Sequence, residues 1–376
     1  MDFDAELGLL SHLRHFMMPI HNRFHQIDLL RFLAALSVMF FHYSFRGYAA
    51  DNMSPLSFPA LGALFRYGYL GVDLFFIISG FVILLTALKR NARDFVISRA
   101  VRLYPAFWFC VSLTFVTTLL IGGGRYHAEF WQYLVNLSML HGYLGVKHID
   151  AVYWSLLVEL KFYFLVFLLI IFRQIQNTKY FLGVWLAISI LLSTYDGASI
   201  LRFFLFPEWS AYFIAGATFY LVYLEGLTLY KAVIILVAYL QALWNAYFSS
   251  IGMIQHYGVE FDYLVIFGVI SVFFSLFFLI AIKKMNVLNR TEFVLLGALT
   301  YPLYLLHQNI GFMIFNELHS HVSKYVLLVG CSFFMFLLAY FVHKYVEERF
   351  SKSFHAILVY LAALPANLFS RLGAVR

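Results

Sequence analysis

The chain has 376 residues, of which 63% are hydrophobic, 20% aromatic and only 12% charged. Soluble domains carry roughly 25% charged residues, and one aqueous-domain core could not bury 44 Phe and 26 Tyr, so the composition excludes an ordinary water-soluble protein and indicates an integral membrane protein. The formal net charge of +7 does not indicate nucleic-acid binding, because the basic residues stand between hydrophobic segments and do not form one patch.

Ten hydrophobic segments predict an all-α fold, a polytopic bundle of about ten transmembrane helices. They lie near 27–46, 67–88, 103–121, 151–172, 180–195, 208–224, 231–249, 262–282, 293–316 and 325–345. The fifth and sixth are short, which is typical of a tilted or re-entrant helix. No internal repeat or Pro-rich linker divides the chain, so one domain is expected.

The ends of the chain are predicted from their polarity. Residues 1–26 lack the apolar region of a signal peptide, so the first helix is expected to direct insertion. A transmembrane domain then spans 27–350, and residues 351–376 form an amphipathic tail. If ten helices alternate from a cytoplasmic N-terminus, most of the 26 Lys and Arg residues fall in the cytoplasm, which predicts both termini there.

The first segment carries two ionisable residues, which are costly in a membrane and therefore tend to mark function. Arg31 and His42 share one helix face and lie about 16 Å apart along it. A permanently charged guanidinium suits a phosphate, and an imidazole suits proton transfer. The long phosphopantetheine arm of coenzyme A would join two such sites. The alternative is that Arg31 reaches lipid headgroups while His42 makes a hydrogen bond between helices.

The second and third segments add further candidates. Asp73 lies near the outer end of the second segment, where Gly71 and Gly80 permit close helix approach. Arg99 and Arg102 share one side at the start of the third helix, which suits a diphosphate, although they also fit ordinary cytoplasmic positive charge.

The fourth and ninth segments supply the remaining candidates. Glu159 lies inside the fourth, on a different face from Lys161, and is a candidate partner for His42. Trp154 at the start of that segment is an expected interfacial anchor. In the ninth segment Pro302 predicts a kink, and His307 is a second membrane histidine on the outer half.

Taken together, these segments resemble the acyltransferase family three membrane proteins. The resemblance runs from about residue 27 to residue 350 and rests on the order of five motifs. These are Arg31 through His42, Gly71-Val72-Asp73-Leu74-Phe75-Phe76 with Ser79-Gly80-Phe81, Arg99 with Arg102, Trp154-Ser155-Leu156 with Glu159 and Phe162-Tyr163, and Tyr301-Pro302-Leu303-Tyr304 with His307.

The resemblance implies an O-acyltransferase of the bacterial cytoplasmic (inner) membrane that uses acyl-CoA, usually acetyl-CoA, to modify an envelope carbohydrate or glycolipid. Neither a metal nor nucleic acid is expected. The implied roles are as follows: His42, Arg31 and Glu159 in catalysis; Arg31, Arg99 and Arg102 in coenzyme binding; and Asp73, Trp154, Tyr301 and His307 on the acceptor side.

Two departures and two alternatives accompany this prediction. The family often closes on a Val-Glu-basic-Pro sequence, whereas Val346-Glu347-Glu348-Arg349-Phe350 lacks the proline, and no SGNH-type hydrolase domain is expected. A transporter or flippase of a glycan or lipid also places charges in the membrane, but many such proteins show inverted repeats that are not evident here. A scaffold in a polysaccharide-export complex would tolerate changes at Arg31, His42 and Glu159.

Overall fold

A computed structural model describes residues 23–373 apart from residues 51 and 196, with side chains up to residue 363. Most of the predicted N-terminal segment 1–26 and the last three residues of the predicted tail 351–376 therefore lie outside the described residues. Within the described ranges all regular secondary structure is helical, which confirms the all-α fold.

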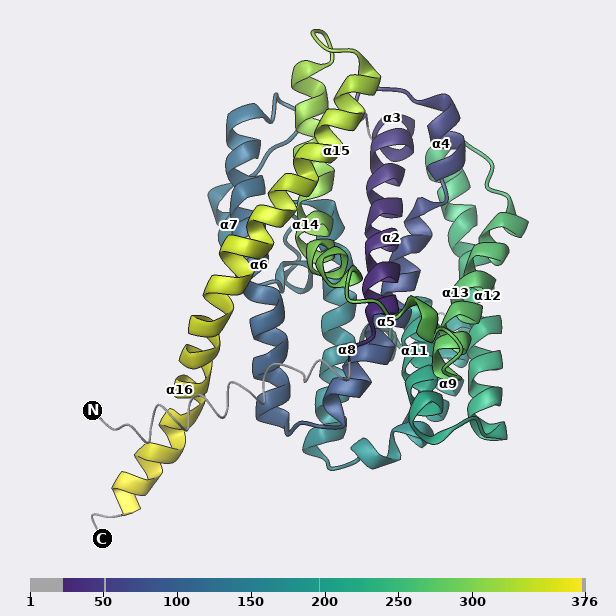
Figure 1. Cartoon of the computed structure of the whole chain (residues 1–376), viewed down its shortest axis with the longest axis vertical. Coiled ribbons are helices and arrows are strands. Elements are labelled where there is room, and N and C mark those ends of the chain that lie inside the picture. The colour runs from purple at the N-terminus through teal and green to yellow at the C-terminus, as the bar shows by residue number, and fades with distance from the viewer. Residues whose placement is uncertain (1–22, 51, 196, 374–376) are drawn as a thin grey trace.

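In the described part of the chain, ten long helices form the bundle, which Figure 1 shows. In chain order they are α2 (His25–Phe41), α5 (Gly71–Ala87), α6 (Ala92–Ile121), α8 (Trp154–Ile171), α9 (Thr178–Thr194), α11 (Pro207–Glu225), α12 (Leu229–Tyr257), α13 (Tyr263–Ala281), α14 (Phe293–Leu318) and α15 (Lys324–Phe341). Each overlaps one predicted hydrophobic segment. The fifth and sixth segments, which are short, correspond to α9 and α11, and each of these is a continuous helix.

Short helices and turns connect the bundle. They include the π-helical turn η2 (His42–Arg46), α3 (Gly47–Ala49), α4 (Pro59–Phe65), the 3-10 turn η3 (Gly68–Leu70), α7 (Phe130–Asn136), the 3-10 turns η4 (His141–Leu144) and η5 (Ala151–Tyr153), α10 (Ser199–Leu205), and the π-helical turn η8 (Val342–Glu347), which leads from α15 into α16 (Glu348–Gly373). In Figure 1, α16 extends away from the other helices. Its contacts with α6 include a hydrogen bond from Arg93 Nη2 to the Val359 carbonyl (2.8 Å).

Eight helical stretches of the described chain are long and apolar enough to cross a membrane. They contain all the long helices except α11 and α14, which are largely buried by their neighbours. A helix enclosed by other helices needs no continuous apolar surface, so these two can carry more small and polar residues. The chain is therefore a multi-pass membrane protein.

The third helix begins earlier than its hydrophobic segment predicts. The Asn91 side chain caps it by accepting a hydrogen bond from the Asp94 amide (2.9 Å), so α6 starts at Ala92. Arg99 and Arg102 consequently lie about two turns inside the helix, and not at its start. This position turns both side chains toward the interior of the bundle.

Two helix pairs position the residues of interest. Helix α5 packs mainly on α11, and α2 packs mainly on α14. A Cβ atom at Gly80 would overlap the Phe213 carbonyl, and one at Gly216 would overlap the Ile77 carbonyl. Glycine at both positions therefore lets the α5 and α11 backbones touch, as the small residue at Gly80 predicts.

Replacing Gly216 with Ala is expected to destabilise the bundle by about 1–3 kcal/mol, because the added methyl group must push α11 away from α5. Thermal melting of the purified protein in detergent would measure the loss. Gly268→Ala in α13 is the matched control, since a Cβ there meets nothing within 4 Å. Equal melting temperatures for the two variants would contradict this packing.

Candidate active site

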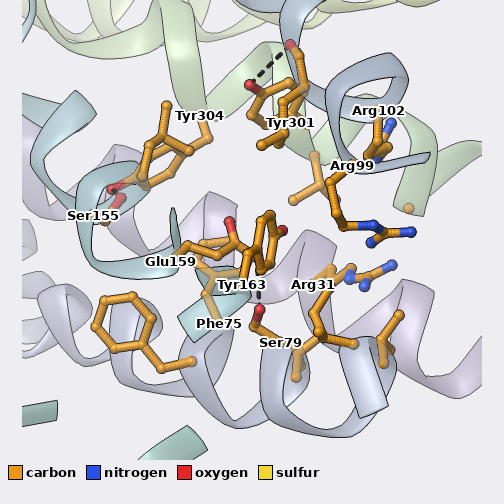
Figure 2. A pocket seen from close by; sticks show the side chains of 18 residues that line it. Arg31, Phe75, Ser79, Arg99, Arg102, Ser155, Glu159, Tyr163, Tyr301 and Tyr304 are labelled. Atoms are coloured by element: carbon orange, nitrogen blue, oxygen red, sulfur yellow. Dashed lines mark hydrogen bonds between the residues drawn. The ribbon is translucent and has the colours of Figure 1, made fainter. Parts of the chain in front are cut away.

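The first cavity lies among α2, α5, α6, α8 and α14 and has a volume of about 130 Å³. We call it the arginine cavity. Its lining comprises Arg31, Phe75, Phe76, Ile78, Ser79, Val82, Ile83, Arg99, Arg102, Leu103, Ser155, Leu156, Glu159, Tyr163, Gly297, Thr300, Tyr301 and Tyr304. Figure 2 shows the guanidinium groups at one side and Ser155 with Tyr304 at the other.

Aromatic rings and carboxylates hold the arginines in place. The Arg102 guanidinium lies over the Tyr301 ring at 5.4 Å and bonds Glu347 at 3.1 Å. Arg99 lies over the Tyr163 ring at 6.0 Å. Asp28 lies 3.8 Å from Arg31 behind the lining, and Glu159 is the one carboxylate among the lining residues. Arginines therefore outnumber carboxylates in the lining itself, which suits a polyanionic ligand.

A shallower pocket continues from the arginines toward the surface. It is lined by Arg90, Ser98, Arg99, Val101, Arg102, Glu347 and Ser351 and has a volume of about 280 Å³. The Arg102 side chain is 43% exposed. Ligand charges at this end of the arginine cavity can therefore remain partly hydrated, whereas Ser155 and Tyr304 line its opposite end (Figure 2).

The second cavity contains His42 and has a volume of about 420 Å³. We call it the histidine cavity. Its lining comprises Val38, Phe41, His42, Arg46, Tyr69, Leu70, Val72, Asp73, Val152, Trp154, Glu208, Trp209, Tyr212, Asn245, Ala246, Ser249, Gly252, Met253, His256, Tyr257 and Tyr304. This lining holds one arginine, Arg46, and two carboxylates, Asp73 and Glu208, whereas the arginine cavity holds three arginines and one carboxylate.

His42 pairs with His307 at the boundary of α2 and α14. The His42 Nδ1 and His307 Nε2 atoms lie 2.8 Å apart, and both residues are buried. His307 Nδ1 faces the carbonyls of Leu303 (3.1 Å) and Tyr304 (2.9 Å), so it must carry the hydrogen. In the neutral pair His42 then donates from Nδ1, and its Nε2 lone pair accepts from Arg46 Nη1, 3.3 Å away.

A polar network surrounds this pair. Arg46 Nη1 lies 3.3 Å from both His42 Nε2 and Gln308 Oε1, while its buried Nε has no hydrogen-bond partner. Asn309 accepts a hydrogen bond from Gln308 (3.0 Å), and its backbone amide donates to Asp150 (2.9 Å). Burial raises the pKa of Asp150, outside the membrane-spanning segments, to about 7. This carboxyl can therefore hold a proton near neutral pH.

The structure separates the predicted site residues into two groups. Arg31, Arg99, Arg102, Glu159 and Tyr301 line the arginine cavity. The other group comprises His42, Asp73 and Trp154 in the histidine cavity, with His307 behind His42.

One expected contact is wrong. Glu159 does not pair with His42: its Oε1 accepts a hydrogen bond from Ser79 at 2.6 Å, because its position on α8 faces α5 in the arginine cavity. Tyr301, which the resemblance places on the acceptor side together with Trp154, lines the arginine cavity, whereas Trp154 lines the histidine cavity.

Sequence reasoning missed Arg46, Gln308 and Tyr43. Arg46 follows His42 by one helical turn, and this spacing was the available signal. Gln308 directly follows His307. Tyr43 donates from its hydroxyl to the His307 carbonyl (2.6 Å), which ties α2 to α14 beside the histidine pair. Nothing in the sequence distinguishes this tyrosine from the other 25.

The chain belongs to the acyltransferase family three, because the family's model, described as an acyltransferase domain, matches residues 24–345. This match confirms the resemblance and identifies the protein as a membrane acyltransferase.

Several known proteins are similar to the chain. Nodulation protein 10 of Rhizobium leguminosarum bv. viciae is 29% identical over 158 residues, 36% of this chain and 41% of the relative. Peptidoglycan O-acetyltransferase OatA of Listeria monocytogenes is 26% identical over 187 residues, 44% and 27% of the two chains. ORF330 of Acidianus two-tailed virus is 25% identical over 295 residues, 75% and 82%.

The chain thus spans less than half the length of the first two relatives. No solved structure matches it significantly.

Proposed function

We propose that this protein transfers an acyl group, in the simplest case acetyl, from acyl-CoA in the arginine cavity to a carbohydrate hydroxyl in the histidine cavity. The observation that carries the proposal is the pair of cavities with opposite chemistry inside one acyltransferase-family bundle. Family membership favours this enzyme over a transporter or a scaffold.

One end of the arginine cavity suits the phosphates of coenzyme A, and the other end suits its pantetheine arm. Arg31, Arg99 and Arg102 present three permanent positive charges to the phosphate groups. The adjoining pocket beside Arg90 gives the nucleotide room near the surface. Beyond the arginines the lining becomes apolar, with Phe75 among its residues, which suits the pantetheine arm and a short acyl chain.

The histidine cavity suits a sugar. The Trp154 and Trp209 rings lie 5.1 Å apart and form a broad aromatic surface for the C–H faces of a pyranose. Asp73, Glu208 and Asn245 add groups that can bind its hydroxyls. The name of the Listeria relative, a peptidoglycan O-acetyltransferase, supports a carbohydrate acceptor.

The histidine pair supplies the proposed chemistry. The acceptor hydroxyl gives its proton to His42 Nε2 as its oxygen bonds to the thioester carbonyl carbon. The carbon–sulfur bond then breaks, and the proton passes from His42 to the departing thiolate to give free coenzyme A. His307 accepts from His42 Nδ1 throughout and thereby orients the ring. Arg46 lies where it can stabilise the oxyanion.

The direction of transfer follows from the predicted topology. We place the protein in the bacterial cytoplasmic membrane with both termini in the cytoplasm, because Lys and Arg favour that side. Arg31 lies near the beginning of α2 and His42 just after its end. The coenzyme would thus enter from the cytoplasm, and the acceptor carbohydrate would arrive from the opposite side.

Replacing His42 with Ala is expected to abolish acylation, because it removes the proposed base that His307 orients in the histidine cavity. Mass spectrometry of the cell's envelope glycans would compare the gene-deletion strain, the wild type and the variant. Of these three strains, only the wild type is expected to carry one acyl group on each modified sugar. His319→Ala, at an exposed position, is the control, and wild-type acylation by His42→Ala would refute the assigned base.

Replacing His307 with Phe is expected to lower kcat by about 10²-fold with little change in KM for acyl-CoA, because His42 loses the group that fixes its tautomer. His307→Gln should recover part of the rate, since its amide oxygen can accept from His42 Nδ1. Steady-state kinetics with acetyl-CoA and released envelope oligosaccharides would measure both variants. A pure KM effect would contradict this role.

Replacing Arg99 or Arg102 with Gln is expected to raise KM for acetyl-CoA by about tenfold or more, since a hydrogen bond to a charged group contributes roughly 1.5–3 kcal/mol. Arg93→Gln is the matched control on the same helix, because Arg93 lies outside the cavity and bonds a backbone carbonyl of α16. Equal KM values for all three variants would place the coenzyme elsewhere.

A further inference from the structure

The two cavities meet at one side chain. Tyr304 is the single residue in the described chain that lines both of them. Its ring is almost completely buried, with 6% of the residue exposed. Any acyl group that moves from the arginine cavity to His42 must therefore pass this ring.

Helices α5 and α8 change cavity at this level. On α5, Asp73 lines the histidine cavity and Phe75 lines the arginine cavity. On α8, Trp154 lines the histidine cavity and its neighbour Ser155 lines the arginine cavity. On α14, Tyr301 belongs to the arginine cavity. The boundary is thus a layer across the bundle, with Tyr304 in it.

Aromatic contacts close this layer. The Phe75 ring meets the Tyr304 ring edge-to-face at 5.6 Å. Phe76, which also lines the arginine cavity, meets Trp154 at 6.2 Å across the boundary. We call Phe75, Phe76 and Tyr304 the aromatic wall. Close-packed rings leave no room for a file of water between the cavities.

The Tyr304 ring is held by its hydroxyl. The Tyr304 and Ser155 hydroxyl oxygens lie 2.8 Å apart, and the Val152 carbonyl accepts from Tyr304 at 3.2 Å. Both partners lie at the junction of η5 and α8, so two hydrogen bonds fix the ring across the boundary.

We propose that Tyr304 is the positioning residue that keeps the donor thioester apart from water in the histidine cavity until transfer. The wall matters because His42 activates any hydroxyl that reaches it. If water entered with the thioester exposed, His42 would take a water proton and the water oxygen would attack the carbonyl carbon. The carbon–sulfur bond would break, the thiolate would take the proton, and the products would be a carboxylic acid and free coenzyme A.

This inference rests on the proposed function. It predicts that loss of the Tyr304 ring increases hydrolysis of acetyl-CoA relative to acetyl transfer. Tyr304→Ala removes the ring, joins the cavities and should raise the ratio of acetyl-CoA hydrolysis to acetyl transfer by about tenfold or more, because closure is what prevents hydrolysis of a reactive donor. Tyr304→Phe keeps the ring and should keep the ratio near that of the wild type.

The experiment uses the full-length protein in nanodiscs with acetyl-CoA and oligosaccharides released from the deacetylated cell envelope. Thiol release without oligosaccharide measures hydrolysis, and labelled acetyl on the oligosaccharide measures transfer. Tyr304→Val serves the same comparison if the Ala variant does not fold. Wild-type transfer with an unchanged ratio in the Ala or Val variant would overturn the role of Tyr304. Absence of wild-type transfer and hydrolysis would instead contradict the proposed function, and this inference with it.

Discussion

The hydrogen bond between His42 and His307 is the constraint on which the rest of this site depends. An uncompensated polar group in a membrane interior is costly, and each histidine satisfies the other across α2 and α14. The bond requires the two helices to lie close, and Gly311 permits this, because a Cβ there would overlap the Tyr43 ring. The π-helical turn begins at His42 and carries Arg46 toward the same ring, and such turns occur frequently at functional sites.

A second constraint keeps Arg31, Arg99 and Arg102 apart from the histidine pair. Arg46 already lies 3.3 Å from His42, and three more guanidinium groups there would disfavour the imidazolium that the proposed base must form. The bundle places these three arginines in one cavity and the histidine pair beside the other, with the aromatic wall between them. In the proposed reaction, charge recognition therefore occurs at a partly exposed end, where Arg102 keeps 43% of its side chain accessible. The proposed proton transfer occurs among buried groups, where orientation by neighbours is strongest.

The sequence predicts the helices well because a bilayer demands long apolar segments, and this demand holds for each helix separately. It also predicts the family, since the motifs are local and ordered. The pairing of side chains between helices was not predictable in the same way. The sequence predicts Glu159 beside His42, yet the packing of α8 on α5 brings it to Ser79 instead. Arg46 stands at the end of the first predicted segment, 27–46, whereas the helix continues through η2 into α3 and Arg46 lines the histidine cavity. Tyr304 belongs to the motif Tyr301-Pro302-Leu303-Tyr304, but its proposed role follows only from its position between the two cavities.

The central claim is that one acyl group crosses the bundle between cavities on opposite sides of the membrane. Sealed proteoliposomes with released envelope oligosaccharides trapped inside, and labelled acetyl-CoA added only outside, test it directly. The account predicts that label accumulates on the trapped oligosaccharides while the acetyl-CoA stays outside, and that His42→Ala abolishes this. In a parallel sample the oligosaccharides are added outside, together with the acetyl-CoA. Label that appears in this sample but not on trapped oligosaccharides would contradict the account.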